Sequence, residues 1–164
     1  MLKALWSYYD AQGISAMRFK CPHQAECRMG CQDFTSAKAA FVSTGYEAHT
    51  LPRVLFLSSD PGSGEATAKQ RTIEGVRHQE EVLRDVYALH RGRHWSRTHQ
   101  MACVLLDPFR PGITEDEVRH FFAHANVVKC SVNNPDRSMA PEWLYRNCAR
   151  YVPGEMEVLQ PDVL

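Results

Sequence analysis

Residues 54–62 read VLFLSSDPG, and this stretch decides the fold class. The four consecutive apolar residues at 54–57 suit a strand that is buried on both faces, as in a parallel sheet. Pro52 precedes the run, and the Ser-Ser-Asp-Pro-Gly sequence that follows it is a strong turn signal. A buried strand that ends in a tight turn predicts the centre of an α/β fold.

On either side of this stretch, apolar runs alternate with helical patterns. Further strands are expected at 101–106 (MACVLL) and 124–129 (HANVVK), with the start of a fourth at 161–164, and helices at 2–12, 74–90, 114–122 and 141–151. Thr114 and Glu117 fit a capping box at the start of one helix, and Pro141 fits the first turn of another. This order predicts one domain over residues 1–164, a three-layer α/β/α fold with a central four-stranded parallel sheet. Ligands bind at the carboxyl ends of such strands, here just after Leu57, Leu106 and Val128.

The composition of the chain limits the cellular locations and binding partners that we expect for it. The formal net charge of the 164 residues is zero, so contact with nucleic acid would need a local basic patch. No run approaches the ~20 apolar residues that span a bilayer. Residues 1–10 lack the basic start, apolar stretch and cleavage site of a signal peptide. We therefore expect a cytoplasmic protein with no membrane partner.

The six cysteines form two groups and one isolated residue. Cys21, Cys27 and Cys31 lie near the start, Cys130 and Cys148 near the end, and Cys103 alone. In a cytoplasmic chain, such grouping indicates metal or redox chemistry more than disulfides. Four thiolates would hold an iron–sulfur cluster and would suit zinc equally well, and the spacing does not choose between them. Cys103 is expected to be an ordinary buried core residue.

Three short segments together resemble the iron–sulfur (family 4) uracil-DNA glycosylases. They are Asn-Val-Val-Lys-Cys at 126–130, Cys-Ala-Arg-Tyr-Val at 148–152 and Leu-Gln-Pro-Asp-Val at 159–163. The polar loop at 131–137 also fits the family pattern. The resemblance implies a uracil-DNA glycosylase-like fold, a 4Fe–4S cluster held by cysteines of both groups, and uracil-containing DNA as partner. The implied reaction is hydrolysis of the N-glycosidic bond of a flipped uracil during base-excision repair.

The resemblance implies that Asn126 reads the base. A side-chain amide offers one donor and one acceptor, so it can pair with the O4 and N3–H edge of uracil and reject cytosine. Base excision requires that the base be flipped into such a pocket. The alternative is an ordinary asparagine at the end of a strand.

The Ser-Ser-Asp-Pro-Gly turn matches the superfamily's water-activating and phosphate-contacting loop. Asp60, directly before Pro61, is the candidate catalytic residue, because a carboxylate here could orient water and stabilise positive charge on the sugar. Ser59, Pro61 and Gly62 are the remaining candidate substrate-binding residues. A structural Asp-Pro-Gly turn needs no chemistry and is the alternative.

A basic segment at 91–99 mixes cations with one tryptophan. Arg93 and Arg97 are the candidate DNA-contacting residues, because cations bind phosphates and an aromatic ring stacks on bases. A solvated connection between a helix and a strand has the same composition.

The chain departs from the family pattern at three places. Ser59 stands where the family has a glutamate, residues 69–75 lack the aromatic residue that stacks on uracil, and the family continues beyond Leu164 with a second catalytic loop. We therefore expect either a fragment or a natural short form. The alternatives to a glycosylase are a catalytically degenerate iron–sulfur module that binds nucleic acid or regulates, and a zinc-stapled α/β protein.

Overall fold

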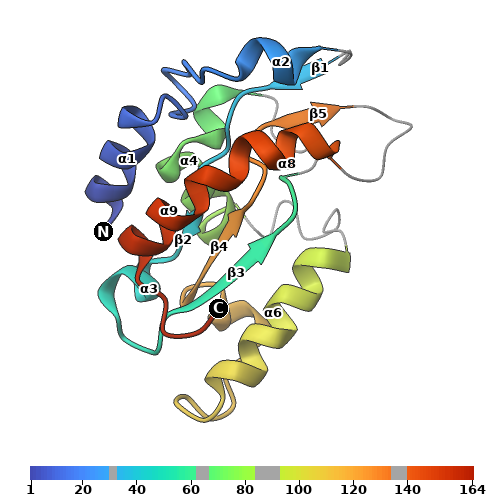
Figure 1. The fold of residues 1–164 in the computed structure, drawn as a ribbon. Coiled ribbons are helices and arrows are strands. Elements are labelled where there is room, and N and C mark those ends of the chain that lie inside the picture. The colour runs from blue at the N-terminus through green and yellow to red at the C-terminus, as the bar shows by residue number, and fades with distance from the viewer. Residues whose placement is uncertain (30–32, 62–66, 84–92, 134–139) are drawn as a thin grey trace.

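Two parallel strands form the centre of the fold (Figure 1). β3 (Val54–Ser58) pairs with β4 (Phe122–Asn126) along its whole length, with Val54 opposite Phe122 and Ser58 opposite Asn126. The computed structural model describes residues 1–29, 33–61, 67–83, 93–133 and 140–164. Within them β2 (Phe41–Val42) adds to the other edge of β4 in the antiparallel sense. A separate two-stranded antiparallel sheet joins β1 (Asp33–Thr35) to β5 (Ser131–Asn133).

Helices surround this small sheet. The α-helices are α1 (Leu2–Ala11), α2 (Gln24–Arg28), α3 (Thr44–Ala48), α4 (Ile73–Glu81), α6 (Arg93–Leu106), α7 (Glu115–Val118), α8 (Glu142–Cys148) and α9 (Val152–Leu159), and short 3-10 helices η1 (Ala68–Arg71) and η3 (Ala149–Tyr151) precede α4 and join α8 to α9. Among the described residues, none of these helices has both the length and the apolar character to cross a membrane.

Strand alternation separates two cores on opposite faces of the sheet. Leu55 and Ala123 pack with α1, α8 and α9 in one core, while Val54 and Phe122 pack with α6 and α7 in the other. This follows from geometry, since successive side chains on a strand point to opposite faces. Figure 1 shows the same arrangement, with α8 and α9 crossing one side of the sheet and α6 standing apart from them.

The predicted α/β class is confirmed, but the sheet differs from the prediction. The described residues form a central sheet of three strands, one of them antiparallel, rather than four parallel strands. The strand expected at 161–164 is reduced to one parallel bridge between Val163 and Val54, where Leu55 N donates to Val163 O at 2.9 Å.

The strand predicted at 101–106 is wrong, because these residues form the second half of α6. Ala102 and Leu106 are buried, whereas Met101 and Val104 are exposed, which is a helical pattern. A six-residue apolar run has no periodicity that separates a buried strand from a helix. The basic segment at 91–99 is also not a connection between a helix and a strand, because its residues from 93 onward begin α6.

The other predicted elements hold with shifted bounds. The helix at 2–12 is α1, and the capping box of Thr114 and Glu117 is present, although α7 ends at Val118 and β4 begins four residues later. The predicted 124–129 strand is therefore Phe122–Asn126. The helix predicted over 74–90 is α4 up to Glu81, and residues 84–92 lie outside the described part of the chain. The helix expected from Pro141 is N-capped by that residue and continues through η3 into α9.

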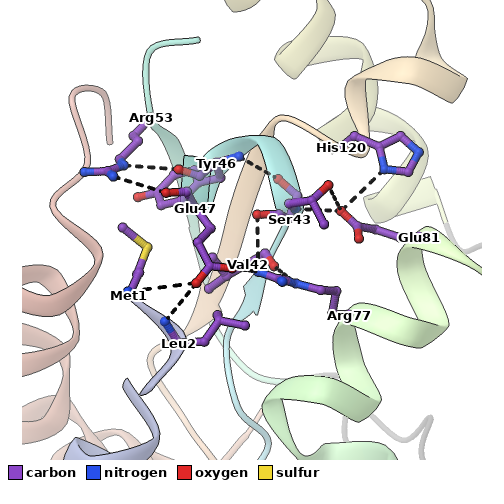
Figure 2. Close-up of polar contacts among 11 residues, drawn as sticks. Met1, Leu2, Val42, Ser43, Tyr46, Glu47, Arg53, Arg77, Glu81 and His120 are labelled. Atoms are coloured by element: carbon purple, nitrogen blue, oxygen red, sulfur yellow. Dashed lines mark hydrogen bonds and ion pairs between the residues drawn. The ribbon is translucent and has the colours of Figure 1, made fainter. Parts of the chain in front are cut away.

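An ionic network near the amino end of β4 ties the first residues to the sheet (Figure 2). The Arg77 guanidinium lies 2.9 Å from the Glu47 carboxylate and donates from Nε to Val42 O at 2.6 Å. The other oxygen of Glu47 accepts from Leu2 N at 3.3 Å and lies 3.9 Å from the amino group of Met1. The network thus fixes α1 and α4 at the end of the sheet opposite Asn126.

Candidate functional site

The carboxyl ends of β3 and β4 bring together the two motifs that were predicted to act on a base. The register places Ser58 directly opposite Asn126. Beyond the strands, Val127 N donates to Ser58 O at 2.8 Å and Val128 N donates to Ser59 O at 2.9 Å. The turn after β3 and the segment after β4 therefore run side by side.

Asn126 is buried, with 5% of its surface exposed. Its side-chain oxygen accepts no hydrogen bond from any described residue. A buried polar atom without a partner is costly and calls for an explanation such as a ligand or water. Its main-chain oxygen, by contrast, accepts from Lys129 Nζ at 2.5 Å, so the backbone of this residue is held in place.

Asp60 lies half-buried at the same edge of the sheet. Its carboxylate accepts a hydrogen bond from Ala140 N at 3.3 Å, which joins the turn after β3 to the segment that leads into α8. Ser59 is exposed and Pro61 is half-buried, while Gly62 lies outside the described residues. Asp60 therefore has a structural contact with the segment before α8, and it follows β3 by two residues at the end of the sheet where Asn126 ends β4.

A serine–histidine pair lies on the same face of the sheet, and the sequence reading missed it. Ser58 Oγ is 2.6 Å from His124 Nε2, and the His124 ring centroid is 4.9 Å from that of Trp95 on α6. Residues 122, 124 and 126 of β4 share one face by strand alternation. That alternation, applied to the correct strand bounds, would have grouped His124 with Asn126.

Four cysteines from distant parts of the sequence share the core on the other face of the sheet. Cys27, Cys130 and Cys148 are buried there and Cys21 packs against them half-buried. Burial raises the pKa of the Cys130 thiol well above its ordinary value, and the neighbouring Cys148, Cys21 and Cys27 raise it further. Cys31 lies outside the described residues, and Cys103 is half-buried on α6 rather than fully buried.

Polar groups approach three of these sulfurs. Asn147 Nδ2 donates to Cys27 Sγ at 3.6 Å, and Lys129 N donates to Cys148 Sγ at 3.5 Å. The Tyr151 hydroxyl lies 3.5 Å from Cys21 Sγ. Burial raises the pKa of Cys148, and the Lys129 amide and ammonium act in the opposite direction by favouring the thiolate.

The donor set fits a thiolate-ligated group in its chemistry. Four thiolates are the usual ligands of an iron–sulfur cluster, and hydrogen bonds to the sulfurs, such as those at three of these cysteines, tune its potential. In the described part of the chain, no three His, Cys, Asp or Glu side chains are arranged to hold a metal ion.

The predicted DNA-contacting residues lie on α6. Arg97 is exposed and lines a shallow apolar surface pocket with Met101, Val104 and Leu105. Arg93 is the first residue of the helix.

No protein-family model, curated protein or solved structure matches this chain. Its likeness to the iron–sulfur glycosylases therefore rests on the motifs in its own sequence.

Proposed function

We propose that this chain is a uracil-DNA glycosylase-like protein that recognises a flipped uracil and hydrolyses its N-glycosidic bond. The observation that carries the proposal is the buried Asn126 amide, whose oxygen accepts no hydrogen bond from a described residue, at the carboxyl ends of two parallel strands. In α/β sheets this is the edge where ligands bind.

Asn126 gives the site its base specificity in this proposal. Its oxygen accepts from uracil N3–H, and its amide nitrogen donates to uracil O4. Cytosine presents an acceptor at N3 and a donor at N4, so both contacts would become repulsive. A site built to pair with one polar edge rejects the opposite edge strongly, because the mismatched groups stay desolvated and unpaired.

Asp60 acts on the sugar side of the bond. Its carboxylate orients a water molecule toward C1′ and stabilises the positive charge that develops there as the bond to N1 breaks. The water oxygen bonds to C1′, and the water proton leaves with the uracil. The products are the free base and an abasic site.

The four cysteines would hold a 4Fe–4S cluster. That group, when bound, supplies a cross-link between the segment that carries Cys21 and Cys27 and the region of Cys130 and Cys148. These cysteines lie in the core on the opposite face of the sheet from Ser58 and His124, so a group held there would have a structural role.

A cleavage assay tests the proposal. Wild-type protein should release uracil from a uracil-containing oligonucleotide and leave the matching cytosine and thymine oligonucleotides intact. Asn126→Ala and Asp60→Asn should each lower kcat/KM by at least about 100-fold, since each removes a group that acts in the transition state. The matched control is Asp116→Asn, which changes an exposed aspartate on α7. Equal activity of wild type and Asn126→Ala on uracil would refute the assignment.

The second candidate is a module that binds nucleic acid without cleaving it. The hydrogen bond from Ala140 N to Asp60 favours it, because this contact gives the carboxylate a structural function. A gel shift on the same oligonucleotides distinguishes the two. Uracil-dependent binding without base release would support the second candidate.

A further inference from the structure

Lys129 connects the candidate base pocket to the cysteine core. The side chain is buried, with 1% of the residue exposed. Its ammonium donates to Asn126 O at 2.5 Å and to the Glu155 carboxylate. Its own main-chain amide donates to Cys148 Sγ at 3.5 Å. One residue thus holds the backbone of the base-reading candidate and a sulfur of the cysteine group.

Glu155 and Tyr9 complete this buried network from the two ends of the chain. Glu155 on α9 is fully buried, and its second oxygen accepts from the Tyr9 hydroxyl at 2.5 Å. The Tyr9 oxygen in turn accepts from Ala40 N at 3.0 Å. Burial and the adjacent Glu155 carboxylate raise the pKa of Tyr9 well above its ordinary value, so the hydroxyl stays a donor. The ammonium and both carboxylate oxygens therefore have partners.

Stability gives little reason for such a network. Removing two charges from water costs about as much as their attraction returns, and apolar residues of the same volume often serve as well. A buried ion pair fixes the positions of its groups, because no water is present to replace either partner. The geometry fixed here includes the main chain of Asn126.

We propose that Lys129, held by Glu155 and Tyr9, is the positioning residue that sets the orientation of Asn126 and thereby the discrimination of uracil from cytosine. The inference rests on the proposed base-reading role of Asn126. Lys129 also links the cysteine core to the pocket, because its main-chain amide donates to Cys148 Sγ while its ammonium donates to Asn126 O.

The test compares two double variants that each remove one ion pair. Lys129→Met with Glu155→Gln removes the buried pair and leaves position 155 an acceptor for Tyr9. Arg77→Met with Glu47→Gln is the matched control, because it removes the pair shown in Figure 2 at the other end of the sheet. The readouts are the NMR signal of the Asn126 side-chain amide and the affinity for free uracil and for uracil-containing DNA.

The 129/155 variant should shift or broaden the Asn126 side-chain signal and weaken uracil binding at least tenfold. The factor by which KM rises should exceed the factor by which kcat falls. The 47/77 variant should melt at a lower temperature than the wild type but keep the Asn126 side-chain signal and the affinity for uracil. An unchanged Asn126 signal and affinity within twofold of wild type in the 129/155 variant would overturn the proposal.

Two further arms keep the result decisive. If the 129/155 variant does not fold, Tyr9→Phe cuts the same network at its far end and should still shift the Asn126 signal; an unchanged signal overturns the proposal. If the wild type ignores uracil, the proposed function fails. The NMR comparison still decides whether Lys129 positions Asn126.

Discussion

Asn126 and Cys130 lie four residues apart, yet their side chains serve different sites. Asn126 ends β4 on the face that also carries His124, whereas Cys130 belongs to the core on the other face of the sheet. Lys129 spans the two, because its side chain reaches back to Asn126 O while its main chain meets Cys148. At the scale of single residues, the short segment 126–130 therefore holds the chemistry of both candidate sites.

Cys148→Ala tests the thiol site at this scale. If four thiolates hold an iron–sulfur cluster, anaerobically purified wild type should contain iron and sulfide and absorb in the visible range. The variant should lose both metal and colour and unfold at a lower temperature, because metal binding is coupled to folding. Cys103→Ala is the control and should keep its iron. A wild type that contains zinc instead, or a Cys148→Ala protein that stays coloured and stable, would contradict the assignment.

Close packing of two helices sets the position of Glu155. Gly154 on α9 lies against the Tyr8 ring on α1, and a Cβ added there would stand 2.4 Å from Tyr8 Cε2. The ring has little freedom to move, because its hydroxyl donates to Tyr151 O at 2.8 Å. At the scale of elements, this contact brings Tyr9 on α1 within hydrogen-bonding distance of Glu155 on α9.

Gly154→Ala should lower the free energy of unfolding by about 1–2 kcal/mol. Overpacking costs ~1–3 kcal/mol, and the better helix propensity of alanine offsets up to ~1 kcal/mol of it. Urea denaturation gives the difference. In a Tyr8→Ala background the same substitution should cost nothing, since the ring that it meets is gone. Additive effects of the two substitutions would show that the helices do not pack as described.

Two ionic networks connect elements of the molecule that lie far apart in the sequence. The network of Glu47 and Arg77 joins α1, α3 and α4 at one end of the sheet (Figure 2). The network of Lys129, Glu155 and Tyr9 joins α1, β4 and α9 near the other end. Burial alone would raise the pKa of Glu47, but hydrogen bonds from Arg77 and the Leu2 amide outweigh it, and the pKa lies below its usual value.

A depressed pKa gives this network a defined pH dependence. The contribution of Glu47 is fully present above the unfolded-state pKa of about 4.3, and it is lost as the pH falls through the lower folded-state pKa. Glu47→Gln should therefore lower the melting temperature at pH 7, by the equivalent of about 1 kcal/mol for a partly exposed pair. At pH 3 the difference between variant and wild type should shrink. Thermal melts of both proteins across this range provide the measurement, and an equal difference at every pH would contradict the assignment.

Local signals in the sequence settled only part of the candidate site. Strand β3 and its end at Ser58 were predictable, because apolar runs and the residues that interrupt them act over a few positions. The capping box of Thr114 and Glu117 was predictable for the same reason. The parallel pairing of β3 with β4 places Ser58, two residues before Asp60, opposite Asn126. The roles of Asp60 and Asn126 remain predictions.

The sequence by itself determined the α/β class, the strand at 54–58 and the capping box of Thr114 and Glu117, since each depends on residues close together in the chain. Tertiary structure alone decided that 101–106 is helical, that β2 runs antiparallel and that Ser58 meets His124 across 66 positions. It also decided the contact between Tyr9 and Glu155, which are 146 positions apart. Packing decides such features because burial depends on which surfaces the folded chain brings together, and no local pattern encodes that choice.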